Sequence, residues 1–232
     1  IITGGSRGIG AATVEAFAKA DYNVVINYVK NDAVASTLKT KIESLYSVSV
    51  LLLKGDISKE EDVNKIVQEV KNKFGRIDVL VNNAGIAIDQ ILEDKTVKEF
   101  QRVVDVNLVG TFLMSKEVGK VMLEQGYGKI INVASTNGID TIYPESIDYD
   151  ASKAGVISLT KNLALAYAPI IQVNAVAPGW VKTQMNQELE DSFIQEEERK
   201  ILLGRFAHPS EIASVIYFLT TNEASYINGT VI

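Results

Sequence analysis

The chain has 232 residues, of which 47% are hydrophobic and 22% are charged, so it can bury one large core and is not a disordered chain. Its net charge is −6 and it has no basic run, which argues against a nucleic-acid partner. The lack of cysteine excludes disulfides and thiolate chemistry and suits the reducing cytoplasm, where we expect the protein.

Short apolar segments alternate along the chain with longer segments of helical period. Most of the short ones are rich in valine and isoleucine on both faces, as in strands covered by helices on both sides. The expected strands are Ile1 to Thr3, Asn23 to Tyr28, Val48 to Leu53, Asp78 to Asn82, Lys129 to Ala134, Gln172 to Ala177 and Thr230 to Ile232. The expected helices are Ala11 to Ala20, Asp32 to Leu45, Glu60 to Phe74, Thr96 to Glu124, Tyr149 to Tyr167, Asn186 to Leu202 and Pro209 to Thr221.

This alternation predicts one α/β domain over residues 1–232, with a doubly wound, mostly parallel, seven-stranded sheet between two helical layers. Ser58 and Glu61 have the spacing of a capping box for the third helix. The only histidine, His208, precedes Pro209 at a helix start and is interpreted as a surface residue, so we expect no metal site and no serine-hydrolase triad. No apolar stretch reaches the roughly 18 residues of a membrane span, so we expect no membrane partner. Both termini fall inside apolar strands and are expected to be incomplete.

A glycine-rich turn, Thr3-Gly4-Gly5-Ser6-Arg7-Gly8-Ile9-Gly10, joins the first expected strand to the first expected helix. In an open α/β sheet this turn can bind the pyrophosphate of a dinucleotide, because glycines allow close approach and the helix N-terminus offers free N–H groups. Its spacing differs from Gly-x-Gly-x-x-Gly, and it is not a P-loop because no Gly-Lys-Ser/Thr follows. Taken alone, the motif is also compatible with a tight turn that binds nothing.

The end of the second strand reads Asn27-Tyr28-Val29-Lys30-Asn31 and has no acid before Asp32. NAD enzymes usually place a carboxylate there, which binds the ribose 2′-hydroxyl. Arg7 and Lys30 would instead offer cations to a 2′-phosphate, so the sequence favours NADP(H) over NAD(H). The alternative is that Lys30 is an ordinary solvated surface lysine.

Tyr149 and Lys153 are four residues apart and therefore share one face of the expected helix. A neighbouring ammonium favours the phenolate, which lets a tyrosine exchange a proton with an alcohol near neutral pH. With nine tyrosines and 18 lysines in the chain, the spacing is also expected by chance, so the pair alone does not define a site.

Polar and turn-forming residues follow successive expected strands. Asn82-Asn83-Ala84-Gly85, Ser135 and Pro178-Gly179 each come after an apolar strand, while Asn107 lies within the long helix. The carboxyl ends of parallel strands form the edge at which such sheets bind ligands, so we expect these residues to meet there.

In their order and spacing, these motifs resemble the short-chain dehydrogenase/reductase family over essentially the whole chain. The matching residues are the glycine turn, Asp56, Asn82 to Gly85, Asn107, Ser135, Tyr149 with Lys153, and Pro178-Gly179 with Thr183. The resemblance implies a Rossmann-type fold and an oxidoreductase that moves a hydride between nicotinamide and a carbonyl or alcohol carbon. It also implies a homodimer or homotetramer, built through the helices at Thr96 to Glu124 and Tyr149 to Tyr167, and no metal.

The resemblance further implies a role for each matching residue. Tyr149 would be the acid/base, Lys153 would bind the nicotinamide ribose and lower the pKa of Tyr149, Ser135 would bind the substrate oxygen, and Asn107 would anchor a water in the proton relay. The expected cofactor contacts are Gly4, Ser6, Arg7, Gly8, Ile9 and Gly10 in the turn, Asn27, Tyr28 and Lys30 after it, Asp56 and Ile57 at the adenine, Asn83, Ala84 and Gly85 at the adenosine ribose, Tyr149 and Lys153, and Pro178, Gly179, Val181 and Thr183 at the carboxamide.

Within the family, the stretches Gly128 to Asn132, Val173 to Gly179, Gly204 to Phe206 and Ala224 to Gly229 resemble 3-oxoacyl-carrier-protein reductases, which implies an acyl thioester substrate and a part in fatty acid biosynthesis. An acidic carrier protein binds best to a basic surface. Segment 187–200, the expected substrate lid, instead has six acids and two bases. Such reductases often carry arginine in two places that correspond here to Glu124 to Tyr127 and Ala168 to Ile171, and neither stretch contains one. A sugar or small alcohol is therefore the alternative substrate.

One departure from the family pattern concerns the substrate pocket. Ser135 and Tyr149 are 14 positions apart, one more than in the commonest members, and the segment Thr136 to Asp148 between them is unusual, so we expect an altered pocket. Two functions of other classes are a sensor that binds NADP(H) without turnover and a purely structural subunit. A sensor would have lost Ser135, Tyr149 or Lys153, and the intact motifs also argue against a structural subunit.

Overall fold

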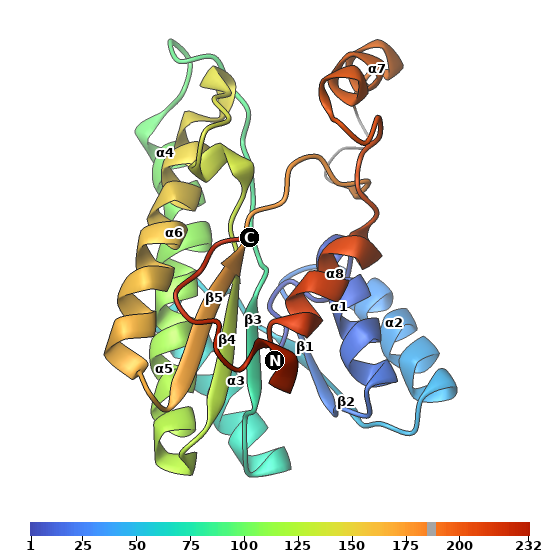
Figure 1. The fold of residues 1–232 in the computed structure, drawn as a ribbon, viewed down its shortest axis with the longest axis vertical. Coiled ribbons are helices and arrows are strands. Elements are labelled where there is room, and N and C mark those ends of the chain that lie inside the picture. The colour runs from blue at the N-terminus through green and yellow to red at the C-terminus, as the bar shows by residue number, and fades with distance from the viewer. Residues whose placement is uncertain (185–188) are drawn as a thin grey trace.

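The computed structural model describes residues 1–184 and 189–232, and its strands are parallel (Figure 1). β1 (Val24–Tyr28) pairs with β2 (Val50–Lys54), and β3 (Val79–Asn82), β4 (Gly128–Val133) and β5 (Ile171–Val176) pair in that order. Ile2 forms single bridges to Ile26 and Val81 and so joins the two groups, while Val231 forms one to Ala175. The strand order reverses at Ile2, where doubly wound sheets bind dinucleotides.

The expected seven-stranded sheet is not confirmed. The described residues form five strands, and the segments expected as the first and last strands contribute only the single bridges of Ile2 and Val231. After Ile2 the chain still donates from Thr3 N to Val81 O and from Gly5 N to Asn27 O, both at 3.0 Å, and Gly4, with a φ of +60°, turns the backbone toward α1 (Gly8–Lys19).

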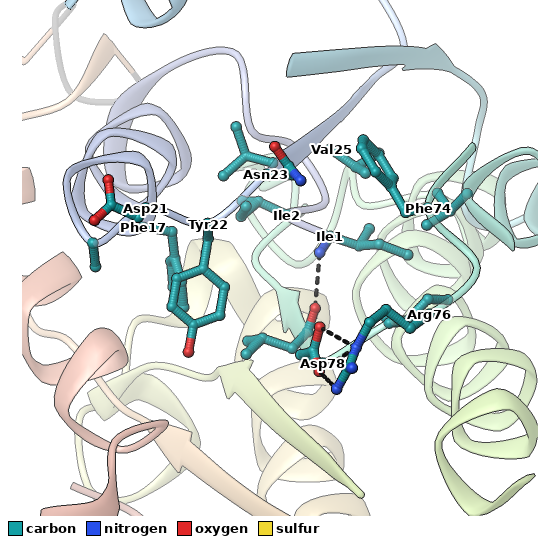
Figure 2. A pocket seen from close by; sticks show the side chains of 15 residues that line it. Ile1, Ile2, Phe17, Asp21, Tyr22, Asn23, Val25, Phe74, Arg76 and Asp78 are labelled. Atoms are coloured by element: carbon teal, nitrogen blue, oxygen red, sulfur yellow. Dashed lines mark hydrogen bonds and ion pairs between the residues drawn. The ribbon is translucent and has the colours of Figure 1, made fainter. Parts of the chain in front are cut away.

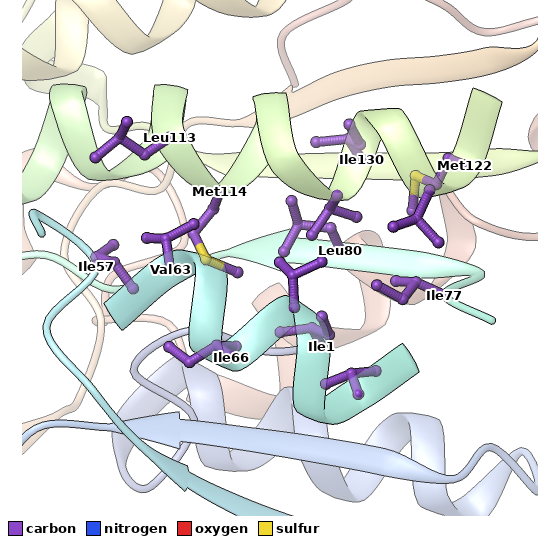
Figure 3. Packing of buried hydrophobic residues seen from close by; sticks show 14 of the residues in the cluster. Ile1, Ile57, Val63, Ile66, Ile77, Leu80, Leu113, Met114, Met122 and Ile130 are labelled. Atoms are coloured by element: carbon purple, nitrogen blue, oxygen red, sulfur yellow. The ribbon is translucent and has the colours of Figure 1, made fainter. Parts of the chain in front are cut away.

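Helices cover both faces of the sheet. α1, α2 (Asp32–Leu45) and α8 (Pro209–Phe218) contribute to one buried cluster, and α3 (Glu60–Phe74), α5 (Gly110–Gln125) and α6 (Ile147–Tyr167) to the other. Along β3 and β4, Leu80 and Ile130 face the second cluster while Val81 and Ile131 face the first, as the period of two requires. Figure 3 shows Leu80 and Ile130 packed with side chains of α3 and α5. Burial of each such side chain contributes roughly 1.5–3 kcal/mol.

The long helix expected from Thr96 to Glu124 has a change of helical type in its middle. α4 (Val97–Val104) is followed by a π-helical turn, Asp105–Val109, and then by α5. Thr96 caps α4, since its hydroxyl accepts from Glu99 N at 3.2 Å and Glu99 Oε2 accepts from Thr96 N at 2.9 Å. The π turn contains Asn107, and such turns often occur at functional sites.

Several expected boundaries need correction. α1 begins at Gly8 rather than Ala11, α6 at Ile147 rather than Tyr149, and the strands shift by one or two residues. α7 (Asp191–Lys200) is shorter than the helix expected from Asn186 to Leu202, and Asn186 lies outside the described residues. α8 ends at Phe218 rather than Thr221, and His208 before it is exposed. Short 3₁₀ turns occupy Thr136–Gly138 (η2), Pro144–Ser146 (η3) and Asn222–Ala224 (η5).

The expected capping box of Ser58 and Glu61 is wrong. α3 begins after Lys59, which makes no side-chain cap. Ser58 instead donates from its N and its Oγ to Asp56 Oδ1, at 3.0 and 2.7 Å. The nearby carboxylate competes for Ser58 and closes a local turn, which removes the hydroxyl from the helix end.

A buried ladder of amides and hydroxyls lies below the carboxyl edge of the sheet. Asn82 Nδ2 donates to Asn132 Oδ1 at 2.8 Å and to Ser115 Oγ at 2.9 Å, and Asn132 Nδ2 donates to Thr160 Oγ1 at 2.8 Å. These bonds join β3 and β4 to α5 and α6, which carry or support the site described below. Within the described ranges, no helix is long and apolar enough to cross a lipid bilayer.

Candidate active site

The loops that follow the parallel strands meet at one edge of the sheet. Thr136 N donates to Pro178 O at 3.1 Å, which joins the segments after β4 and β5. A methyl group on Gly85 would lie 3.3 Å from Asn107 Oδ1 and 3.5 Å from Lys153 Nζ, so the segment after β3 touches the π turn and α6. A methyl group on Gly8 would lie 3.4 Å from Thr183 Cγ2, so the segment after β5 also reaches the glycine turn. The structure thus gathers the expected motifs at this edge.

Tyr149 and Lys153 share one face of α6, as expected, and Lys153 Nζ lies 5.5 Å from the centroid of the Tyr149 ring. Lys153 is 4% exposed, and its Nζ donates to Val133 O at 2.7 Å. Burial lowers the pKa of Lys153 to about 8, because the charged form loses its hydration.

Burial raises the pKa of Tyr149, and the negative charges of Asp150 and Asp89 add to the rise, while a hydrogen bond with Ser135 opposes it. The pKa of Tyr149 is therefore raised rather than lowered as expected, because burial of the phenol is the largest effect on it. Tyr149 holds its proton near neutral pH, which is the form that protonates the oxygen of a carbonyl substrate.

Ser135 follows β4 and begins the turn η2. It is 6% exposed, its Oγ accepts from Asn137 N at 3.2 Å, and the same Oγ lies 3.2 Å from Asn137 Oδ1 and 3.5 Å from Pro178 O. The Ser135 hydroxyl also acts on the Tyr149 hydroxyl, since it lowers the pKa of that phenol. Two converging donors of this kind can hold one substrate oxygen and stabilise negative charge on it.

Asn107 is 1% exposed, and both its Nδ2 and its Oδ1 make hydrogen bonds within the protein. Its Nδ2 donates to Ile86 O at 2.9 Å and Ser152 Oγ at 3.0 Å, and its Oδ1 accepts from Ile86 N at 2.9 Å. The side chain therefore fastens the segment after β3 to α6. The expected part of Asn107 in a water relay stays a prediction.

The glycine turn fits the pyrophosphate of a dinucleotide. Gly4 and Gly8 have φ values of +60° and +55°, which side chains disfavour, and a methyl group on Gly10 would come within 2.4 Å of Gly4 O. The turn therefore exposes main-chain atoms at the N-terminus of α1, beside the half-buried Ser6 and Ile9. Because this cradle adjoins Thr183, a dinucleotide bound there can extend toward Tyr149 and Lys153 along the same edge.

The charges near the end of β1 bear on the choice of cofactor. Arg7 and Lys30 are exposed, and neither makes an ion pair within the described part of the chain. The nearest acid, Asp32, accepts from Tyr28 Oη at 2.9 Å and from Lys54 Nζ at 2.9 Å. Its negative charge is thus already compensated.

Three expected cofactor contacts use their side chains elsewhere. Asn27 is 1% exposed and donates to Leu53 O and Gly55 O at 3.2 and 3.0 Å. Asn83 Nδ2 donates to Thr3 O at 2.9 Å and Gly4 O at 3.2 Å, which holds the glycine turn against the end of β3. Ile57 is 2% exposed and belongs to the core. These side chains support the site, and their expected contacts with a cofactor stay a prediction.

Asp56 is also engaged, since its Oδ2 pairs with Arg102 at 2.9 Å. Burial opposes its ionisation, but hydrogen bonds from Ser58 and Arg102 outweigh burial and lower the pKa of Asp56. Val181 is buried and bridges Ala207, and a methyl group on Gly179 would lie 3.9 Å from Thr136. The remaining expected contacts, Ala84 and Pro178, lie in the segments after β3 and β5.

Sequence reasoning missed two interactions beside Tyr149. Asp150 Oδ1 accepts from Asn137 Nδ2 at 2.7 Å, and its Oδ2 accepts from Tyr143 N at 3.1 Å. On the other side, Asp148 pairs with Lys95 at 3.0 Å, with side chains 0% and 4% exposed. The available signal was that two acids flank the tyrosine of the Tyr-x3-Lys motif.

A separate cavity of about 320 Å³ lies at the opposite end of the sheet (Figure 2). Its lining includes Phe17, Tyr22 and Phe74 together with the ion pair of Arg76 and Asp78 at 2.6 Å. None of the residues that line it belongs to the motifs above, so we do not place the reaction there. Among the described residues, no group of three acidic or histidine side chains is arranged to hold a metal.

Comparisons with known proteins agree with this geometry. A family model described as "Enoyl-(Acyl carrier protein) reductase" matches residues 4–232. The 3-oxoacyl-[acyl-carrier-protein] reductase FabG of Aquifex aeolicus is 38% identical over 233 residues, which cover 100% of this chain and 93% of that protein. The 3-oxoacyl-[acyl-carrier-protein] reductase of Synechocystis sp. is 39% identical over 231 residues, which cover 99% and 92%.

Solved structures give the same result. A short chain dehydrogenase from Bacillus anthracis has a TM-score of 0.89 at 36% identity, and the match covers 100% of this chain and 92% of that one. A short-chain type dehydrogenase/reductase from Mycobacterium marinum has a TM-score of 0.94 at 33% identity, with coverage of 100% and 91%. The protein is thus an oxidoreductase that uses a nicotinamide cofactor. It belongs to the short-chain dehydrogenase/reductase family.

Proposed function

We propose that this protein is an NADPH-dependent reductase of 3-oxoacyl thioesters. The observation that carries the proposal is the placement of Ser135, Tyr149 and Lys153 together at the sheet edge that also holds the glycine turn. The names of the two curated relatives support the substrate class, because both are 3-oxoacyl-[acyl-carrier-protein] reductases.

A bound nicotinamide supplies the hydride in this reaction. The hydroxyls of Ser135 and Tyr149 donate hydrogen bonds to the 3-oxo oxygen and stabilise the charge that develops on it. Tyr149 then passes its proton to that oxygen as the alcohol forms. Lys153 would bind the nicotinamide ribose, and its ammonium would stabilise the phenolate that Tyr149 leaves behind.

The preference for NADP(H) over NAD(H) is part of the proposal. Its support is that Arg7 in the glycine turn and Lys30 after β1 are exposed, and that Asp32 is already paired with Lys54. A 2′-phosphate would meet two available cations and no free carboxylate there.

The test is the oxidation of NADPH with an acetoacetyl thioester, with NADH measured in parallel. A crotonyl thioester is the matched alternative, because the description of the family model names an enoyl reductase. A fast rate with NADPH and the acetoacetyl thioester, with none on the crotonyl thioester, supports the proposal. Turnover of the crotonyl thioester would instead identify an enoyl thioester as the substrate. No rate with either thioester, while NADPH still binds, favours a sugar or small alcohol.

Tyr149→Phe separates an enzyme from a nucleotide-binding sensor. Because the variant lacks only the hydroxyl, it should lose turnover and keep its NADPH affinity, measured by nucleotide fluorescence. Unchanged turnover would remove Tyr149 from the acid/base role.

We also propose a homodimer or homotetramer formed through α4, α5 and α6. Its support is that Val97, Phe112 and Leu165 on these helices are 84%, 43% and 82% exposed. Sedimentation should give a multiple of the 25.3 kDa chain mass, and a monomer at micromolar concentration contradicts this assembly. A cytoplasmic location stays a prediction from the cysteine-free composition.

A further inference from the structure

Two residues outside the matched motifs connect the catalytic helix to the catalytic serine. Asp150 follows Tyr149 on α6, and its Oδ1 accepts from Asn137 Nδ2 at 2.7 Å. Asn137 in turn donates from its N to Ser135 Oγ at 3.2 Å and places its Oδ1 3.2 Å from the same Oγ. We propose that Asp150 is a positioning residue that acts through Asn137 to set the hydrogen-bond direction of Ser135. The proposal rests on the role of Ser135 in the proposed function.

The carboxylate determines which way the Asn137 amide faces. An ionised carboxylate only accepts hydrogen bonds, so Asn137 must turn its Nδ2 toward Asp150 and its Oδ1 toward Ser135. The bond between them is charge-assisted and therefore roughly twice as strong as a neutral one. Asn137 consequently presents Ser135 with one donor, its main-chain N, and one acceptor, its Oδ1.

This arrangement prepares Ser135 to donate. Because Ser135 Oγ accepts from Asn137 N, its O–H bond is polarised and donates more strongly. The proton can rest on Asn137 Oδ1 and move to a substrate oxygen without a change in the rest of the turn. With the Asn137 amide reversed, Nδ2 would face Ser135 Oγ and compete for its lone pairs, so the resting proton would lose its acceptor at 3.2 Å and be left with the more distant Pro178 O at 3.5 Å.

Charge, and not only shape, is required at position 150. The Oδ2 of Asp150 accepts from Tyr143 N at 3.1 Å while its Oδ1 accepts from Asn137. An asparagine at this position has one acceptor oxygen, and its NH2 group would face a donor. Asp150→Asn therefore loses at least one of the two bonds at almost constant volume.

The test is a double-mutant cycle of Asp150→Asn and Asn137→Ala, read as kcat and KM for the carbonyl substrate that the wild type reduces. Each single variant should lower kcat about tenfold and leave the KM for NADPH within about twofold, since it acts on Ser135 and not on the nucleotide. The double variant should also lose about tenfold, because both changes interrupt one connection. A loss of about a hundredfold, or unchanged kcat in Asp150→Asn, overturns the proposal.

Asp140→Asn is the matched control, because Asp140 is an exposed acid in the same loop whose side chain makes no hydrogen bond or ion pair in the described structure. It should keep wild-type kcat, and thermal melting should show that all variants fold. A wild type that reduces no thioester refutes the proposed substrate and not this proposal, because the cycle then uses whichever sugar or alcohol the enzyme turns over.

A measurement without substrate tests the same connection. The NMR signal of the Asn137 side-chain amide, assigned by its loss in Asn137→Ala, should exchange slowly with water in the wild type and faster in Asp150→Asn. Equal exchange in both proteins overturns the proposal even if no substrate is found.

Discussion

Gly138 lies directly against the main chain of Lys153, since a methyl group on Gly138 would come within 2.6 Å of the Lys153 carbonyl carbon. Gly138 ends the turn η2 that begins after Ser135, and Lys153 is one turn beyond Tyr149 on α6. The close contact therefore sets the separation of the hydroxyl groups of Ser135 and Tyr149, which we propose hold the substrate oxygen.

Gly138→Ala should separate Ser135 from Tyr149. The added methyl group meets main-chain atoms, which cannot rotate away, so η2 must move and kcat should fall by about tenfold to a hundredfold. Gly75→Ala is the control, because Gly75 ends α3 at a φ of +74° with open space around it. That change should cost about 1 kcal/mol of stability and leave kcat unchanged. Kinetics with urea unfolding checks both, and wild-type kcat in Gly138→Ala contradicts the argument.

Lys153→Met should change how stability depends on pH. Burial lowers the pKa of Lys153 from 10.5 to about 8, so between these values the unfolded chain binds more protons than the folded one. The stability of the wild type therefore rises as the pH increases through that window. Below pH 8, the buried ammonium of Lys153 destabilises the folded state by about 3 kcal/mol. From pH 8 to 10.5, the free energy of unfolding of the wild type should therefore rise by about this amount relative to that of Lys153→Met. A constant difference in urea unfolding rules this out.

Arg7→Gln and Lys30→Gln should each weaken NADPH binding by about tenfold and change NADH binding by less than about twofold. The reason is that only NADPH carries the 2′-phosphate that these cations would contact. Lys19→Gln is the control, because Lys19 is an exposed cation at the far end of α1. Fluorescence titrations at two salt concentrations measure the effect, which should shrink as salt screens the charges. Equal losses for both nucleotides would place the phosphate elsewhere.

The sequence predicts the order of strands and helices well, because apolar periodicity is a local property. It also predicts that Tyr149 and Lys153 share a helix face, since a spacing of four has one geometric meaning in a helix. The π turn at Asn107 could not be predicted, because one extra residue in a turn leaves the apolar pattern almost unchanged. The terminal segments at Ile2 and Val231 form only single bridges to the neighbouring strands. Their extent depends on where the backbone turns away, which local residue types do not specify.

Partners of polar side chains were harder to predict than their positions. Asn27 and Asn83 were expected to contact the cofactor, and the structure shows that both side chains donate to main-chain carbonyls, which the sequence did not predict. A buried amide must have a partner, yet its residue type does not say whether that partner is a ligand or the chain itself. Asp150 and Asn137 were missed for the same reason, since they are 13 residues apart and meet only after the loop folds back.

Lys95→Met should destabilise the protein strongly, because Lys95 and Asp148 form a buried ion pair next to Tyr149. The variant leaves a buried carboxylate without its cation, which costs about 3–5 kcal/mol. Lys95→Met with Asp148→Leu removes both charges and should recover most of that loss. Lys41→Met breaks the exposed pair with Glu15 and serves as the control, with an expected cost below about 1 kcal/mol. Urea unfolding of the four proteins decides the matter, since a double variant as unstable as the single one would show that packing around Lys95, and not the uncompensated charge, causes the loss.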